Sequence, residues 1–510
     1  MEAKLKTDAI EYLKTVLDTS FTQEETSEAI VPDAYPDMQA ILDVEGNITL
    51  RSKEAGSGRL SLSGAVAVSV VYLPEGENLL RKLEFSIPFT TGCDASEVTD
   101  NTKVSLIAKV GNIDARMINS RKVLVRAEIL VEARGYEENA LHLTTGLEGE
   151  NQAGLHLRQE QLELRFVSQV REKTFVLSDE VGLPAGKPLV GEILKSRVGL
   201  HTEDVKNVGS KLIFKGTALI HVLYTAQNTL ELDMFQFRVN FSQIMELEGE
   251  GEGAGYEIAL MLTNVYIESG GGESGSIAVE MHMVAQAVEK KTRIFPYIAD
   301  AYSTHFDLEA QRIEQSVESL DQQAELEAEI RESVELPLGV TRVLDTSLTT
   351  GRVHWSMEGD KLILRSSVSL SALYMTEEGQ PAGFTRRFEA RAEMDVPPGR
   401  TYSVTARPGT EIQVAPSTKG VEVRLPLVFT VVPTRKTRFT AIEALTWDEE
   451  APRDLSSLPS VVVFHAEGGE SLWHLAKRYS STEALIVGAN GISPEDAPYP
   501  GQLFIIPKAR

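Results

Sequence analysis

An alternation of apolar and other side chains recurs three times along the chain. In each run every second residue is apolar or small, and the run ends on a tyrosine at position 72, 224 or 374, a spacing of about 150 residues. Period-2 alternation over this length predicts a long β-strand with one buried face. The three runs are Leu60, Leu62, Gly64, Val66, Val68, Val70, Tyr72; Leu212, Phe214, Gly216, Ala218, Ile220, Val222, Tyr224; and Leu362, Leu364, Ser366, Val368, Leu370, Ala372, Tyr374.

The register of this repeat extends to both sides of the alternating runs. Upstream, Pro32, Pro36, Ile41 and Leu42 correspond to Pro184, Pro188, Ile193 and Leu194, and Val343 and Leu344 take the last two places in the third copy. Downstream, Phe85, Ile87 and Phe89 correspond to Phe237, Val239 and Phe241, with Phe388 and Ala390 as the best third-copy candidates. Matching at so many positions predicts three duplicated domains, each large enough for its own core.

Two details refine the predicted domains, which span residues 1–155, 156–308 and 309–445. Gly64 and Gly216 indicate a bulge or a close approach, which Ser366 relaxes in the third copy. Residues 322–337 have a helical composition but alternate as a strand would, and we favour a strand at the C-terminal end of this segment. The fold class predicted is mostly β, with three tandem β-sandwich-like domains.

The last part of the chain follows a different pattern. Residues 446–460 are acidic and contain prolines and serines without periodicity, which predicts a linker, and residues 461–510 predict strand, helix, helix, strand. Ser471 and Thr482 are expected to be helix N-caps, and Asn490-Gly491 ends the second helix. The expected buried residues are Leu472, Leu475, Ala476 and Tyr479 in the first helix and Leu485, Ile486 and Ala489 in the second.

Composition restricts the function more than it identifies it. The 510 residues carry a formal net charge of −25, which disfavours binding to nucleic acid or to an anionic membrane. The single cysteine, Cys93, indicates a reducing compartment, and neither a signal peptide nor a membrane span is evident, so we expect a cytoplasmic protein. No arrangement of residues typical of catalysis, metal binding or cofactor binding is found, so we expect no enzyme.

The repeated segments resemble a known family. Residues 31–44, VPDAYPDMQAILDV, followed by an alternating strand that ends in VYL, resemble the SPOCS domain of spore-forming Firmicutes. Three such copies before the C-terminal module resemble SipL-type spore-coat morphogenetic proteins. The resemblance implies no catalytic residues. It implies a partner, the ATPase whose polymer forms the basement layer of the spore coat on the forespore surface in the mother cell.

The C-terminal module resembles the LysM domain. The resemblance is carried by Gly469 to Trp473, Ala476 to Tyr479, Asn490-Gly491, Tyr499 to Gln502 and Ile506-Pro507. LysM domains commonly bind N-acetylglucosamine chains between two loops. By resemblance, the ligand- or partner-binding residues are Gly469, Glu470, Ser471, Leu472, Trp473, Asn490, Gly491 and Ile492.

Several features of the module leave its ligand open. Glu470 and Ser471 stand where Asp and Thr are usual in LysM domains, and residues 493–500 add acidic charge beside the expected groove. Trp473 lies at the edge of the buried stripe, so it is either an exposed interface anchor or a cap on the small core. His474 is expected at the surface.

Two functions follow from these observations. The first is a non-enzymatic spore-coat adaptor that recruits the coat ATPase through its LysM domain and contacts other coat proteins, with the two modules joined by a flexible linker. The second is a peptidoglycan-binding protein in which the repeats act as spacers. The expected absence of an export signal favours the first.

Overall fold

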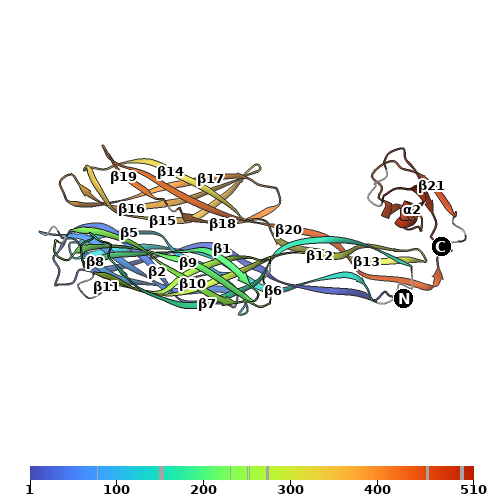
Figure 1. Ribbon diagram of the computed structural model, residues 1–510, viewed down its shortest axis with the longest axis horizontal. Coiled ribbons are helices and arrows are strands. Elements are labelled where there is room, and N and C mark those ends of the chain that lie inside the picture. The colour runs from blue at the N-terminus through green and yellow to red at the C-terminus, as the bar shows by residue number, and fades with distance from the viewer. Residues whose placement is uncertain are drawn as a thin grey trace.

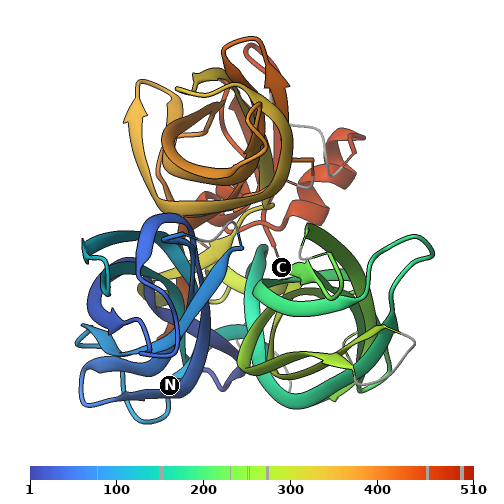
Figure 2. The same cartoon turned by 90° about the vertical axis from the view of Figure 1, so that its left-hand side faces the viewer.

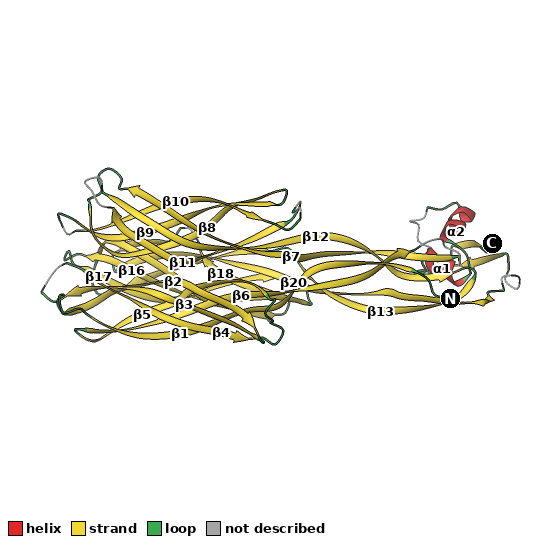
Figure 3. Ribbon diagram, turned by 90° about the horizontal axis from the view of Figure 1, so that it is seen from below, coloured by secondary structure: helices red, strands yellow, loops and turns green. Residues whose placement is uncertain are grey.

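The molecule is elongated, with a thick body of strands at one end, a narrow stalk, and a small helical module at the far end (Figures 1 and 3). This computed structural model describes residues 1–509 except 77–78, 149–153, 230, 250, 252, 271–274, 410, 455, 457–458 and 494–498. Both the first residue and the last strand lie at the stalk end of the molecule. The regular elements in the described residues of the body and the stalk are all β-strands, joined by turns and short loops, as the alternating pattern predicts.

The first repeat forms a lobe of two facing three-stranded layers. One layer has the order β2-β3-β4 and the other β1-β6-β5, all antiparallel. Apolar side chains from both layers form one continuous core, which is the sandwich-like arrangement that the sequence predicts. The strands are β1 (Leu5–Ile30), β2 (Met38–Gly56), β3 (Arg59–Pro74), β4 (Arg81–Asp94), β5 (Lys103–Asn119) and β6 (Lys122–Leu147).

The second repeat has the same strand order, with β8-β9-β10 in one layer and β7-β12-β11 in the other. The two repeats share one six-stranded sheet because β1 and β7 meet at a single pair, Leu13 and Val167. The strands are β7 (Leu155–Gly182), β8 (Val190–Val208), β9 (Lys211–Ala226), β10 (Leu232–Glu246), β11 (Gly255–Gly270) and β12 (Ser276–Ser303).

The third repeat keeps the plan but divides two of its strands. The counterpart of β1 and β7 is broken at residues 321–323 into two strands that both pair with β20, and the counterpart of β5 and β11 is likewise in two pieces. Residues 324–335 of the segment 322–337 therefore form a strand, as the alternation in this segment predicts. The strands are β13 (Phe306–Leu320), β14 (Ala324–Glu335), β15 (Val340–Glu358), β16 (Lys361–Thr376), β17 (Pro381–Asp395), β18 (Arg400–Pro408), β19 (Gln413–Ser417) and β20 (Gly420–Pro452).

The three tyrosines that end the alternating runs occupy equivalent buried positions. Each lies on the central strand of its three-stranded layer, and its partner on the preceding strand is Ile41, Ile193 or Val343, the residues matched from the sequence. The internal repeat is thus a repeat of structure in all three copies, including the divergent third.

The glycine of the first two runs allows an aromatic ring to pack across the strand. A Cβ placed on Gly64 would lie 2.7 Å from the Phe89 ring and 2.4 Å from the Thr49 carbonyl oxygen, and Gly216 meets Phe241 in the same way. Each glycine also faces a bulge in the neighbouring strand, as the sequence predicts. In the third copy Ser366 pairs with Ala390 instead, so the smaller residue opposite makes room for a side chain.

The three lobes pack side by side around a common axis rather than one after another (Figure 2). Near the tip of the body, the axis is filled by apolar side chains at equivalent positions of the three central strands and their neighbours: Val71, Leu80, Leu194, Leu223, Leu344 and Leu373. Burial of these residues between the lobes stabilises the body as one unit.

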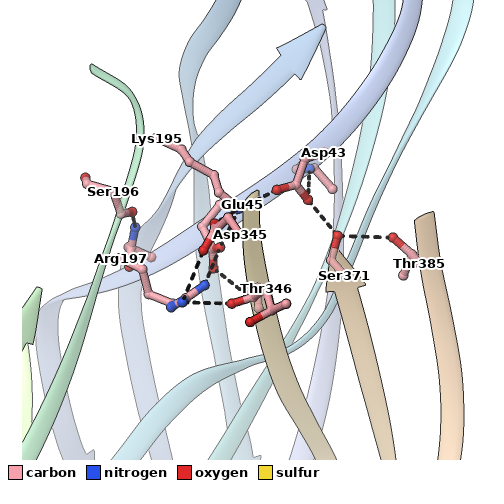
Figure 4. A network of polar contacts seen from close by, with 12 residues as sticks. Asp43, Glu45, Lys195, Ser196, Arg197, Asp345, Thr346, Ser371 and Thr385 are labelled. Carbon is pink, nitrogen blue, oxygen red and sulfur yellow. Dashed lines mark hydrogen bonds and ion pairs between the residues drawn. The ribbon is translucent and has the colours of Figure 1, made fainter. Parts of the chain in front are cut away.

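A buried ionic cluster lies on the same axis (Figure 4). Equivalent positions of the three repeats carry Asp43, Lys195 and Asp345, and the Lys195 ammonium pairs with both aspartates, at 2.7 Å from Asp345. Two residues further on, Arg197 pairs with Glu45 at 3.2 Å and donates to the Thr346 carbonyl at 2.9 Å. Each lobe supplies part of the cluster, so its charges find their partners only when all three lobes are in place.

A second polar contact joins the three lobes nearer the stalk. Arg134 of the first lobe donates to both carboxylate oxygens of Glu257 in the second lobe, each at 3.0 Å. The same guanidinium donates to the Ser403 hydroxyl of the third lobe at 3.0 Å. One side chain therefore fixes the positions of three lobes through a planar set of donors, which a lysine could not provide.

The stalk is made of strands that continue out of the lobes. Its three antiparallel ribbons are the outer parts of β1 with β6, β7 with β12, and β13 with β20 (Figure 3). They enclose a small hydrophobic core of their own, to which every ribbon contributes: Ile10, Leu143, Leu162, Leu164, Phe166, Tyr297, Val317, Phe439 and Ala441.

The predicted linker at residues 446–460 is only partly correct. Strand β20 continues to Pro452 and pairs with β13, with Trp447 opposite Leu308, so residues 446–452 belong to the stalk. The pattern failed here because residues 448–452 are exposed on both faces of their ribbon and therefore show no alternation. Residues 455, 457 and 458 of the predicted linker lie outside the described residues.

Candidate functional site

The C-terminal module has the predicted order of elements. Strand β21 (Val461–His465) is followed by α1 (Leu472–Arg478), α2 (Glu483–Asn490) and β22 (Leu503–Pro507), and the two strands pair antiparallel. The Ser471 hydroxyl accepts from the His474 N–H and the Thr482 hydroxyl from the Leu485 N–H, so both predicted N-caps are confirmed. Gly491 ends α2 in the left-handed conformation with φ of 62°.

The two helices bury their apolar faces unequally. Leu472, Leu475 and Ala476 of α1 are buried as predicted, and Tyr479 packs against them. In α2 only Ile486 is buried. The expected burial of Leu485 and Ala489 is wrong, because this two-turn helix contacts the core along one edge and leaves Leu485 40% exposed.

The first predicted binding loop is held in its conformation by the Glu470 carboxylate. Glu470 accepts from the Gly468 N–H at 2.9 Å and the Glu467 N–H at 3.2 Å. Hydrogen bonds from the backbone N–H groups of Glu470 itself, Glu467 and Gly468 hold the pKa of the Glu470 carboxyl below its usual value. Gly469 is exposed, with open space where a Cβ would point. The longer Glu therefore orders the turn, and Gly469 remains accessible.

The second predicted loop is anchored by Asn490. Its side-chain oxygen accepts from the Ile505 N–H at 2.7 Å, and its amide donates to the carbonyls of Ile505 at 2.6 Å and Ile486 at 2.7 Å. Asn490 therefore ties the end of α2 to β22. Gly491 is exposed, again with open space around its Cβ direction, and Ile492 packs on the core that also contains Leu472. Of the acidic segment 493–500, residues 494–498 lie outside the described residues.

Trp473 is not an exposed anchor. Its side chain is 6% exposed and lies between the module core and the end of the stalk, so the core-capping interpretation is nearer the structure. The ring of Trp473 meets Tyr302 edge to face with centroids 4.8 Å apart, and the indole N–H donates to Asp300 at 2.9 Å. The neighbouring His474 is exposed, as predicted.

Asp300 and Tyr302 are contacts that sequence reasoning missed. Partial burial by itself raises the pKa of the Asp300 carboxyl. Hydrogen bonds from Lys477, Trp473 and Arg312 outweigh this effect and hold that pKa well below the usual range. These residues lie at the end of β12 in the second repeat, and their pattern there is that of an ordinary strand end. No local signal could have linked them to the module.

A hollow of about 410 Å³ lies where the lobes meet and is lined by Trp355, Tyr402 and Arg134 among others. Its buried charge is already satisfied by the contacts of Arg134 described above. Among the described residues, no three His, Cys, Asp or Glu side chains are grouped to hold a metal ion. Cys93 lies on β4 opposite Leu60, where burial raises the pKa of its thiol.

Comparison with protein families agrees with this geometry. The model of the SipL SPOCS domain matches residues 37–118, which are β2 to β5, and residues 189–269, which are β8 to β11. The LysM model matches residues 468–507. The chain carries two SPOCS domains of the SipL type and a LysM domain. The third repeat lies outside the matched segments, yet its β15-β16-β17 layer has the same strand order as the other two.

This domain content confirms the resemblance drawn from the sequence. SPOCS and LysM domains together make this a sporulation protein with a domain of a peptidoglycan-binding type, and both are binding or adaptor domains rather than enzyme domains. No curated protein matches the chain. In the described part of the chain, no helix is long and apolar enough to cross a membrane.

Proposed function

We propose that this protein is a non-enzymatic adaptor of spore-coat assembly. Its LysM domain recruits the coat morphogenetic ATPase to the forespore surface in the mother-cell cytoplasm, and its SPOCS lobes contact other coat proteins. The observation that carries the proposal is the position of the LysM domain, at the far end of a stalk and opposite the lobes, with Gly469 and Gly491 of its two binding loops exposed. A molecule of this shape can hold two different partners apart at one surface.

Peptidoglycan binding is the second candidate. The match to the LysM family supports it, because domains of this type bind N-acetylglucosamine chains. Glu470 and Ser471 differ from the Asp and Thr usual in LysM domains, but they do not block the binding loops. The Glu470 carboxylate is hydrogen-bonded to the backbone of its own turn. The two candidates use the same loops and differ in the ligand.

A pair of matched substitutions tests both candidates. Gly491→Asn keeps the left-handed geometry that Asn tolerates and adds an amide beside the second loop, whereas Gly488→Asn adds the same amide on the exposed side of α2. The full chain and both variants are tested for co-sedimentation with purified peptidoglycan and for binding to the purified coat ATPase. Adaptor function predicts ATPase binding that Gly491→Asn weakens about tenfold and Gly488→Asn leaves unchanged. Binding to peptidoglycan alone, with the same variant pattern, would establish the second candidate instead.

A further inference from the structure

The LysM domain contacts the stalk through a charged and hydrogen-bonded site. Asp300, near the end of β12, accepts from the Trp473 indole N–H at 2.9 Å and from the Lys477 ammonium at 2.7 and 2.8 Å. On its stalk side, the same carboxylate accepts from Arg312 at 2.8 Å. Asp300 is thus held in position by the stalk and presents its remaining acceptors to α1.

An aromatic residue of the stalk enters the core of the LysM domain. Tyr302 is 5% exposed and belongs to the same apolar cluster as Leu475, Ile486 and Phe504. Its hydroxyl donates to the Ser481 carbonyl at 2.9 Å. On its other side the Tyr302 ring stacks on His156, with centroids 4.9 Å apart. The contact therefore buries apolar surface in addition to the ionic site.

Arg453, the first residue after β20, is hydrogen-bonded to both the stalk and the LysM domain. The Arg453 guanidinium donates to Asp307 of β13 at 2.6 Å and to the Ser480 hydroxyl of the LysM domain at 2.6 Å. Strand β21 begins only eight positions later, at Val461. A tether this short gives a millimolar effective concentration, at which a contact with a dissociation constant of about 10 µM would be closed roughly 99% of the time.

We propose that Asp300 and Tyr302 form an intramolecular docking site that fixes the LysM domain as the rigid tip of the stalk. The docked face consists of Trp473, Lys477 and the turn at Ser480-Ser481. The exposed loop glycines Gly469 and Gly491 take no part in these contacts. Docking therefore sets the direction in which the binding loops face while leaving them free for a ligand. This replaces the flexible linker expected from the sequence, and it goes beyond the proposed function because it holds for either ligand.

The test measures the distance between the stalk and the LysM domain in the full chain. Spin labels are placed at Ile294→Cys on the exposed face of the stalk and at Ala489→Cys on α2, in a Cys93→Ser background, and pulsed electron paramagnetic resonance gives the distance distribution. Docking predicts one narrow distribution. Asp300→Ala should broaden it at least twofold, whereas Glu309→Ala, which removes an exposed carboxylate from the same end of the stalk, should leave it unchanged.

Two controls keep a folding defect from imitating undocking. Asp300 belongs to the stalk, so slow hydrogen exchange at Phe504 and Ile506 should persist in Asp300→Ala and show that the LysM core is intact. Trp473→Phe keeps an aromatic ring against Tyr302 but removes the N–H donor, and should broaden the distribution less than Asp300→Ala. A broad distribution in the unaltered background, or a narrow one in Asp300→Ala, would overturn the proposal.

Discussion

Lys195 and Asp345 stand at equivalent positions of the second and third repeats, yet they carry opposite charges and form an ion pair of 2.7 Å on the axis between the lobes. Their side chains are 3% and 6% exposed. Asp43 of the first repeat completes the set. The repeats have diverged at this position in a way that only a three-lobe assembly can use, because each charge is paired with a side chain of another lobe.

Removing the cation should destabilise the body strongly. In Lys195→Met, the buried carboxylates of Asp43 and Asp345 lose their common partner, which typically costs about 3–5 kcal/mol. Lys206→Met is the matched control, since Lys206 is an exposed lysine of the same lobe, and it should change the free energy of unfolding by less than about 0.5 kcal/mol. Urea unfolding of the full chain measures both. Equal effects of the two substitutions would show that the axial pair contributes little.

The same cluster should make stability depend on pH in the acid range. Burial alone raises the pKa of the Asp345 carboxyl, but the charges of Lys195 and Arg197 outweigh it and hold that pKa below the usual value. In the unfolded chain the pKa is about 3.9. The contribution of Asp345 is therefore present above about pH 4 and is lost as the pH falls through the folded-state pKa.

The matched variant for this pH dependence is Asp345→Asn. It should be less stable than the unaltered chain at pH 7, because the Lys195 charge keeps fewer counter-charges. Between about pH 4 and pH 3 its urea midpoint should fall less steeply than that of the unaltered chain, since one titrating carboxyl is gone. Parallel midpoint-against-pH curves would contradict the assignment.

The glycine on the central strand should not tolerate a side chain in the first two repeats. Gly64→Ser places an atom against the Phe89 ring and the Thr49 carbonyl, and we expect a loss of about 1–3 kcal/mol from overpacking. The converse change, Ser366→Gly, creates no clash but removes the buried hydrogen bond from the Ser366 hydroxyl to the Gly351 carbonyl, and should cost about 1 kcal/mol. Thermal unfolding of the two variants gives the comparison. Phe89→Ala should relieve Gly64→Ser only in part, because the backbone carbonyl stays in place.

Asn490 should stabilise the LysM domain, in addition to any contact that it makes with a ligand. Asn490→Ala leaves the Ile505 N–H and two carbonyls without their present partners, and we expect local stability to fall by about 1–2 kcal/mol. Hydrogen exchange of β22 in the full chain measures this, with Ala484→Ser as an exposed control on the same helix. Unchanged protection of the Ile505 amide in Asn490→Ala would contradict it.

Local patterns predicted the elements of this protein well, and contacts between distant elements poorly. Alternation identifies β3, β9 and β16, and the capping residues Ser471 and Thr482 mark the helices, because each signal depends only on a strand's buried face or a helix's first turn. The three-lobe axis could not be inferred, because Asp43, Lys195 and Asp345 differ in charge and so do not look like a repeated feature.

The candidate site shows the same limit. The loop residues Gly469 and Gly491 could be named from the LysM resemblance, and the structure leaves both exposed. The position of Trp473 could not be decided, because its partners Asp300 and Tyr302 belong to another domain far along the chain. A helix's hydrophobic face shows that a residue is buried, and gives no information about which segment covers it.

Strand β12 has a mechanical consequence. It runs without a break from Ser276 at the tip of the second lobe to Ser303 beside the docked LysM domain, 28 residues that at ~3.3 Å each span roughly 90 Å. Along that length it pairs antiparallel with β7 through an almost continuous ladder of backbone hydrogen bonds. A pull on the LysM domain would reach β20 through the chain and β12 through the contacts of Asp300 and Tyr302, and the hydrogen bonds of each strand's ladder would share the load. The molecule should therefore resist stretching along its stalk.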